Sequence, residues 1–286
     1  MTWELGVAGL AALAWGGSDF LAGLGARRVS VRTVLIGSKA TGAVLAVLYL
    51  LARPGPLPHD ARTILVAAAA GLVGVPAMAL FYLAMRDGPL AIVTPVAAGA
   101  ALVPVAWGFG HGEHLDALGV AGAVTALAGI TLASLPATST RPRAAATFRA
   151  TLCAAGAALG FGAYFVLLHE AAPQDPYGAT ACARITGGLV ILLFVLLRPA
   201  PARPVPADRR WTIWLLPAAV GVSDTLADGA FALSATGGAL GTAAILASLY
   251  PAVTVALNVT LLREHLPRVH LLGVLSALVA VACLAR

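Results

Sequence analysis

Charge is scarce in this sequence, and lysine is almost missing. Asp, Glu, Lys and Arg make up only 10% of the 286 residues, and Lys39 is the single lysine beside 17 arginines. Hydrophobic residues make up 60% of the chain, and the mean hydropathy is +0.92. Soluble domains carry about 25% charged residues, so this composition excludes a water-soluble globular protein and indicates a chain embedded in a lipid bilayer.

Patterns that would bind a metal, a nucleotide or a nucleic acid are also missing. The three cysteines (Cys153, Cys182 and Cys283) stand singly in apolar runs, which excludes a disulfide framework and favours inert packing. His111-Gly112-Glu113-His114 contains metal-binding side chains, but it lies in a turn and lacks the H-E-x-x-H spacing, so no metal is expected. There is no G-x-x-x-x-G-K-[ST] loop, and the formal charge of +6 comes from short loops, so we expect neither cofactors nor nucleic acid partners.

The chain consists instead of successive apolar runs of about 20 residues, long enough to cross a bilayer as helices. Such long, continuous runs exclude the short alternating strands of a membrane barrel. The first run has no basic segment before it and is too long to be a signal peptide. We predict an all-α integral membrane protein with ten transmembrane helices, over 3–25, 31–51, 62–84, 90–109, 117–135, 149–169, 177–197, 211–233, 238–262 and 269–284.

The sequence also repeats itself. Residues 39–54 read KATGAVLAVLYLLARP and residues 184–199 read RITGGLVILLFVLLRP, while GEHL at 112–115 is echoed by REHL at 263–266. Ordered matches continue along the chain at offsets of 145 to 151 residues. We therefore predict a first five-helix repeat over 1–135, a linker over 136–148 and a second five-helix repeat over 149–286. Because five is odd, the second repeat is expected to be inverted in the membrane, which gives alternating access a structural basis.

Ionisable residues inside apolar helices cost several kcal/mol, so each of them is a functional candidate. Lys39 and Arg184 match in the repeat and lie about two turns inside their helices, where long side chains reach the interface. For this basic pair we favour a structural role, in anchoring helices or pairing them, over direct substrate contact.

Three aspartates break the repeat: Asp19, Asp224 and Asp228. Asp224 and Asp228 are spaced i,i+4 on one helical face, where two carboxylates repel and one binds a proton readily. One interpretation is that they bind the substrate or a coupling proton. The alternative is that Arg184 or Lys39 neutralises them in a packed network.

Three uncharged residues complete the candidate site. Trp15 and Ser18 share a helix stripe with Asp19, and Tyr164 is aligned with Asp19 in the repeat. The aromatic rings are candidates to pack on an apolar or cationic substrate, with ordinary helix packing as the alternative. Prolines inside the predicted helices are candidate hinges: Pro76, Pro95, Pro104, Pro217 and Pro251.

Two motifs remain. Residues 15–20 read Trp15-Gly16-Gly17-Ser18-Asp19-Phe20, and a second run extends from Pro251 through Glu264-His265-Leu266 to Gly273. They are similar to the W-G-S-x-F pattern and the Pro…Glu-x-Leu…Gly ending of the EamA branch of the drug/metabolite transporter superfamily, which the chain resembles. The resemblance implies a ten-helix inverted-repeat carrier that moves small metabolites or amphipathic compounds without ATP. It also implies that both termini are cytoplasmic. Thirteen loop arginines lie on the opposite face and only three on the face of the termini, so the positive-inside rule instead places both termini outside the cytoplasm, and the orientation is left open.

We therefore predict a secondary-active exporter or exchanger in a bacterial inner membrane. Its partners would be the bilayer, a small-molecule substrate and, as a candidate coupling ion, the proton. Monomer and homodimer are both left open. The alternatives to a carrier are an intramembrane enzyme, for which Gly17-Ser18-Asp19 with Asp224 is only a loose motif, and a membrane scaffold.

Overall fold

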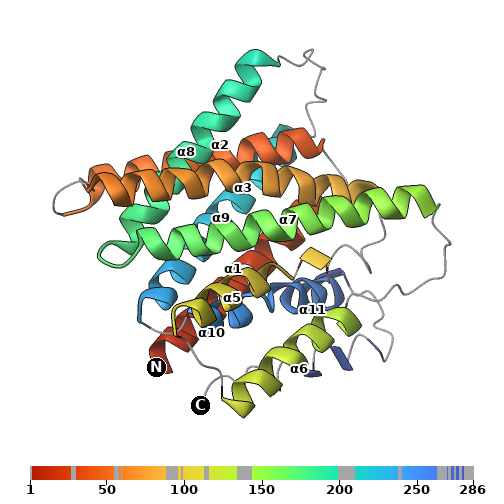
Figure 1. Ribbon diagram of the computed structural model, residues 1–286. Coiled ribbons are helices and arrows are strands. Elements are labelled where there is room, and N and C mark those ends of the chain that lie inside the picture. The colour runs from red at the N-terminus through yellow and green to blue at the C-terminus, as the bar shows by residue number, and fades with distance from the viewer. Residues whose placement is uncertain are drawn as a thin grey trace.

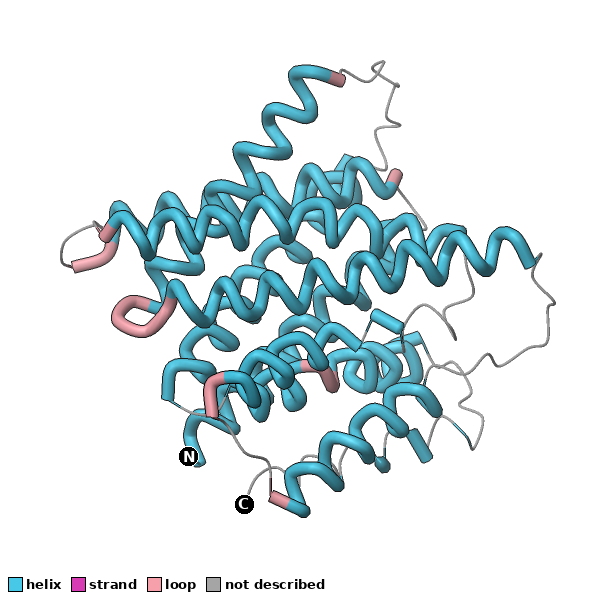
Figure 2. Tube along the Cα trace, viewed as in Figure 1, coloured by secondary structure: helices cyan, strands magenta, loops and turns pink. Residues whose placement is uncertain are grey.

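The chain folds into a bundle of helices in the computed structural model (Figures 1 and 2). The structure describes residues 2–26, 30–54, 58, 60–87, 96–97, 99–112, 116–133, 144–198, 210–237 and 240–262, and six positions between 269 and 279. Within these residues the elements are α1 (Thr2–Ala26), α2 (Val31–Ala52), α3 (Ala61–Asp87), the 3₁₀ turn η1 (Gly99–Ala101), α5 (Leu102–Gly110), α6 (Ala117–Ala133), α7 (Ala144–Ala171), α8 (Pro176–Leu197), α9 (Arg210–Gly237), α10 (Leu240–Ala247) and α11 (Tyr250–Leu262).

Short polar side chains fix where several helices begin. The Ser30 hydroxyl accepts a hydrogen bond from the Thr33 N–H at 3.1 Å at the start of α2. The Asp175 carboxylate accepts one from the Gly178 N–H at 2.9 Å at the start of α8. Each satisfies an N–H group that has no partner inside its own helix. The apolar runs therefore begin as helices at defined residues.

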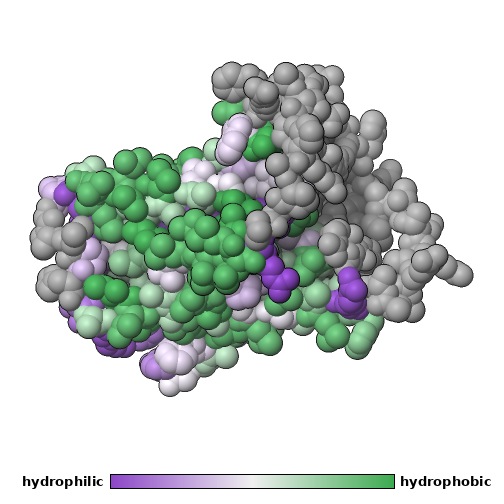
Figure 3. Space-filling view, turned by 90° about the horizontal axis from the view of Figure 1, so that it is seen from above, coloured by the Kyte–Doolittle hydropathy of each residue, from purple (hydrophilic) through white to green (hydrophobic). Residues whose placement is uncertain are grey.

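The lengths and surfaces of the helices fit a bilayer. Among the described residues, five helical segments are long and apolar enough to cross a membrane: Trp3–Ala22, Val31–Ala52, Ala61–Met85, Phe148–Ala171 and Pro176–Leu197. Large apolar side chains such as Leu51 and Trp214 are more than three-quarters exposed, and Figure 3 shows hydrophobic residues across most of the described part of the visible face. Such a surface is unfavourable in water and stable against lipid chains. The protein is a multi-pass membrane protein.

Helices from the two halves of the sequence pack against each other. The helix α3 runs along α7, and α1 lies against α9 (Figure 1). The helix α2 contacts both α8 and α9, and α3 also contacts α8. The centre of the molecule is therefore built from α1, α2 and α3 of the first half and α7, α8 and α9 of the second.

Glycines make these contacts close. A methyl group added to Gly71 of α3 would lie 2.3 Å from the carbonyl oxygen of Ala183 of α8, and one added to Gly221 of α9 would lie 2.5 Å from that of Ser38 of α2. Neither methyl group fits, because backbone oxygen atoms cannot move aside as side chains do. Small residues allow such approach where lipid gives helices little hydrophobic drive to associate. These two contacts are equivalent in the sequence repeat, in which Gly71 matches Gly221 and Ser38 matches Ala183.

The structure departs from the predicted boundaries in two places. The predicted helix over 238–262 is interrupted at Ser248 and Leu249, which separate α10 from α11 just before Pro251. The helix α7 begins at Ala144, inside the stretch predicted as a linker, because the alanines at 144–146 favour a helix. Most of the predicted helix over 269–284 lies outside the described residues.

Candidate substrate site

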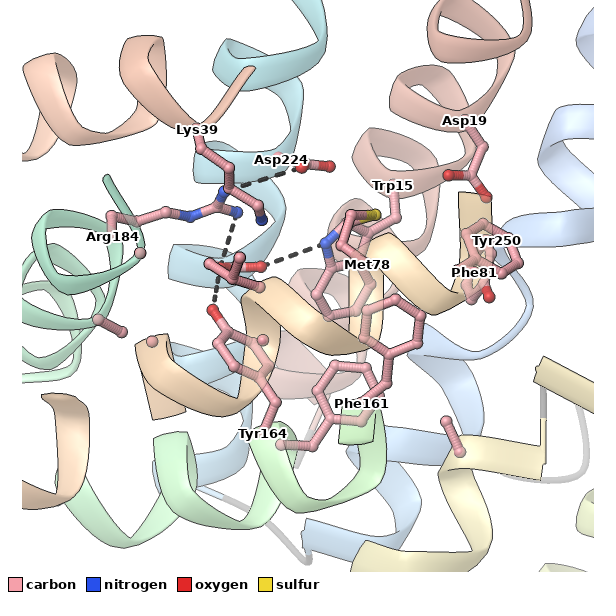
Figure 4. Close-up of a pocket in the computed structure, with 18 of the residues that line it drawn as sticks. Trp15, Asp19, Lys39, Met78, Phe81, Phe161, Tyr164, Arg184, Asp224 and Tyr250 are labelled. Carbon is pink, nitrogen blue, oxygen red and sulfur yellow. Dashed lines mark hydrogen bonds and ion pairs between the residues drawn. The ribbon is translucent and has the colours of Figure 1, made fainter. Parts of the chain in front are cut away.

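A cavity lies between the two halves, near the middle of the long helices (Figure 4). It has an empty volume of about 860 Å³ when its open side is included. Five charged side chains line it, from both halves of the chain: Asp19 of α1, Lys39 of α2, Arg184 of α8, and Asp224 and Asp228 of α9. The structure thus brings together all five ionisable residues that the sequence singled out. A concave site with a few converging polar groups is the usual form of a small-molecule site.

Arg184 forms the centre of the charged group. Its Nη2 atom lies 2.7 Å from Asp228 Oδ2, and its Nη1 atom lies 3.7 Å from Asp224 Oδ2. All three residues are buried, with at most 5% of their surface exposed. The guanidinium of Arg184 is therefore within ion-pair distance of both carboxylates of the i,i+4 pair. One positive charge against two carboxylates leaves an excess negative charge in the group.

Each carboxylate also accepts a hydrogen bond from the first half of the chain. Trp15 Nε1–H donates to Asp228 Oδ1 at 3.2 Å, and the Ser18 hydroxyl donates to Asp224 Oδ1 at 2.6 Å. The Tyr164 hydroxyl of α7 donates to Asp228 Oδ2. The three uncharged candidates therefore all contact the aspartates, so the charged group connects the two halves at their centre.

Lys39 and Asp19 differ from the rest of the group. In the described part of the chain, neither makes a hydrogen bond or an ion pair within 4 Å. Both line the cavity and remain partly exposed. Lys39 therefore makes no ion pair within 4 Å among the described residues, and its predicted role in anchoring or pairing helices stays a prediction.

Aromatic and apolar side chains form most of the remaining wall, and the sequence did not predict them. They include Met78, Phe81, Phe161, Phe165 and Tyr250. Trp15 packs between them, with ring centroids 5.2 Å from Phe165 and 6.5 Å from Tyr250. An uncharged aromatic residue in an apolar helix carries no sequence signal that separates a cavity wall from lipid-facing packing.

The predicted hinges have different surroundings. Pro76 lies inside α3 and Pro217 inside α9, and each helix continues through its proline. Pro104 is buried in the first turn of α5, and Pro251 follows the break between α10 and α11. Pro95 lies outside the described residues. A proline near the start of a helix removes no internal hydrogen bond, so of the four candidates in the described part of the chain only Pro76 and Pro217 interrupt hydrogen bonding within a long helix.

Two ion pairs connect the halves at one end of the bundle. We call this end the N-terminal side, because α1, α3 and α8 begin there and α2 and α7 end there. Arg53 Nη1 lies 2.5 Å from Asp175 Oδ2, and Arg62 Nη2 lies 3.1 Å from Glu170 Oε2. The hydrogen bond to Asp175 holds the pKa of Arg53 above its ordinary value. The sequence did not predict these pairs, since loop charges are ordinarily solvated.

Apolar helices enclose these buried charges in a multi-pass membrane protein, and comparison with known proteins identifies the family. Residues 148–286, the second half, match the model of the EamA-like transporter family. The chain therefore belongs, through this half, to that family, whose members are drug/metabolite-type membrane transporters of small molecules and not enzymes.

A solved structure described only as "Crystal structure of protein" has the same fold. It aligns with a TM-score of 0.81 at 20% sequence identity, over 99% of this chain and 96% of that chain. No curated protein matches the chain in sequence.

Proposed function

We propose that this chain is a secondary-active carrier with ten membrane-spanning helices in two inverted repeats. It moves a small metabolite or amphipathic compound by alternating access through the cavity between the halves. The observation that carries this proposal is the buried group of Arg184, Asp224 and Asp228, which lines a cavity at mid-span and bonds to both halves. Charges at this depth are costly and persist where a solute or ion uses them.

The packing between the halves supports alternating access. The close contact of Gly71 in the first half with Ala183 in the second corresponds, in the repeat, to the contact of Gly221 in the second half with Ser38 in the first. The packing between the halves is therefore equivalent in the two directions. The ion pairs of the N-terminal side have no such equivalence. Arg53 matches Arg198 and Asp175 matches Ser30, which has no carboxylate to pair with Arg198. The ion pair between Arg53 and Asp175 therefore stabilises the conformation in which the N-terminal side is closed. When the two halves exchange their conformations, that side opens.

The charge of the site supports coupling to a proton or a cationic group. With every group ionised, Lys39 and Arg184 contribute +2 while the three aspartates contribute −3, so the sum is −1. A proton or cation that binds Asp228 neutralises it and weakens its bonds with Arg184, Tyr164 and Trp15. Because Trp15 belongs to the first half, binding at Asp228 loosens the contact between the halves.

Efflux from proteoliposomes tests the function without a known substrate. Vesicles would be loaded with a small-molecule cell extract, and mass spectrometry would follow the loss of each compound from the lumen. We expect at least one compound to leave faster from wild-type vesicles than from protein-free vesicles, with a change in luminal pH if protons are exchanged. The variant Asp228→Asn should abolish this difference. The matched control Asp60→Asn should retain it, because Asp60 lies outside the cavity and Asn also accepts the hydrogen bond from the Thr63 N–H.

Two results would contradict the carrier. Conversion of a luminal compound into a product of different mass, without efflux, would indicate an enzyme. Equal retention of every compound by wild-type and protein-free vesicles would indicate a protein that does not transport.

A further inference from the structure

The unpaired ammonium group of Lys39 indicates one part of a ligand. Arg184, its counterpart in the repeat, binds two carboxylates, whereas Lys39 has no acceptor within ion-pair distance among the described residues. Lys39 lines the cavity, and the residue as a whole is partly exposed. An ammonium group has three N–H donors, and a desolvated donor without an acceptor is costly. A carboxylate is the acceptor that satisfies it best.

Asp19 presents the opposite requirement at the other end of the cavity. Its carboxylate has no donor in the described part of the chain, although Trp15 and Ser18 on the same helix both bind the aspartates of α9. Figure 4 shows Lys39 at one end of the cavity and Asp19 at the other, beside Tyr250. An ammonium group would satisfy Asp19, and the neighbouring ring would add a cation–π contact.

The wall between these two ends is apolar. Trp15 and Met78 lie between Lys39 and Asp19 in Figure 4, with Phe81 and Phe161 along the same cavity. A ligand that spans the two ends therefore needs a hydrocarbon segment between its charges. An α-amino acid, whose two charged groups are attached to the same carbon atom, has no such segment between them.

We propose that the substrate is a zwitterion whose ammonium and carboxylate groups are separated by an apolar spacer, with the carboxylate on Lys39 and the ammonium on Asp19. This inference rests on the proposed function and names the substrate class of the same site. The formal charge of the five ionisable cavity residues is consistent with a zwitterionic substrate. A zwitterion leaves the sum of −1 unchanged, whereas an anion alone makes it −2. A cation alone makes the sum zero but leaves the Lys39 donors without an acceptor.

Four probes with six carbon atoms each separate the possibilities. They are 6-aminohexanoate with spaced charges, 2-aminohexanoate with adjacent charges, hexylamine with only the cation and hexanoate with only the anion. Affinity would be measured with purified full-length protein, by ligand-dependent thermal stabilisation. We expect 6-aminohexanoate to bind at least about tenfold more tightly than each of the others, since each alternative loses a charge-assisted hydrogen bond.

Variants at the two ends assign the contacts. Lys39→Met should remove the advantage of 6-aminohexanoate over hexylamine, and Asp19→Asn should remove its advantage over hexanoate. Lys39→Arg should restore binding, because it keeps the positive charge, and Asp60→Asn should bind as wild type does. These paired effects distinguish ligand contact from a general loss of stability, which would weaken the binding of all four probes equally.

The proposal is overturned if 2-aminohexanoate or hexylamine binds as tightly as 6-aminohexanoate, or if none of the four probes binds. It is also overturned if neither end variant changes the order of the probes. Efflux that depends on Asp228, measured in the proteoliposomes, would persist in each of these cases if the protein is a carrier of another substrate. Failure of this inference is thereby distinguished from failure of the proposed function.

Discussion

Removal of Arg184 should destabilise the protein strongly, and removal of a partner should restore part of the loss. The variant Arg184→Met leaves Asp224 and Asp228 without their cation at positions that are 4% exposed. Breaking a buried ion pair from one side costs about 3–5 kcal/mol. At about 2–4 °C per kcal/mol, the melting temperature should fall by at least about 6 °C.

The double variant Arg184→Met/Asp228→Asn tests the reason for this loss. It removes one of the two repelling carboxylates, while Ser18 continues to donate to Asp224. We therefore expect its loss of stability to be about 0.5–3 kcal/mol smaller than the sum of the losses of the two single variants, which is the size of coupling found between contacting residues. The control Arg62→Met removes an exposed pair with Glu170 and should cost less than about 1 kcal/mol.

Thermal unfolding of the five proteins in one detergent provides the measurement. Two results would refute the reasoning. One is an Arg184→Met protein whose melting temperature equals that of the wild type. The other is a double variant whose loss equals the sum of the single losses, because additivity means that the charges do not interact.

Three further predictions concern the packing and the closed side. Gly71→Ala and Gly221→Ala should each lower the melting temperature measurably, because the added methyl group meets a backbone oxygen, whereas Gly17→Ala should not, since nothing lies within 4 Å of its methyl group. Arg53→Met should open the N-terminal side more often, seen as faster labelling of a cavity cysteine from that side; an unchanged rate would contradict closure by the Arg53–Asp175 pair. Ser30→Asp should also raise the labelling rate from the N-terminal side, because it supplies Arg198, on the opposite side, with the carboxylate that Asp175 supplies to Arg53. Its control is Ser30→Asn, which keeps the helix cap without the charge.

The charged part of the site could be predicted because buried charge is conspicuous in an apolar helix. Asp19, Lys39, Arg184, Asp224 and Asp228 could only face one another or a cavity, and the structure places them together. Which of the two basic residues pairs with the aspartates could not be predicted. Lys39 and Arg184 are equivalent in the sequence repeat, yet only Arg184 is within reach of the aspartates, since the alignment does not give the tilt and rotation of α2 and α8.

The uncharged residues of the cavity and the break between α10 and α11 were not predicted, for a related reason. Phe81, Phe161 and Tyr250 look like any apolar helix residues, and only the packing of α3, α7 and α11 brings them to the cavity. The break at Ser248 and Leu249 carries no glycine and precedes Pro251, so the sequence suggested a bend without its position. The family match over residues 148–286 confirms the family resemblance and includes the Pro251–Gly273 pattern, whereas the Trp15–Phe20 motif lies outside the matched residues.

Access to the cavity from the two sides of the membrane tests the central claim most directly. A single cysteine at Ser248, which lines the cavity, would be introduced after Cys153, Cys182 and Cys283 are replaced. A membrane-impermeant maleimide would then be applied to right-side-out and inside-out vesicles. Alternating access predicts that Ser248→Cys reacts from both sides and that Arg53→Met raises the reaction rate only from the N-terminal side. Labelling from one side alone, unchanged by Arg53→Met, would contradict the account.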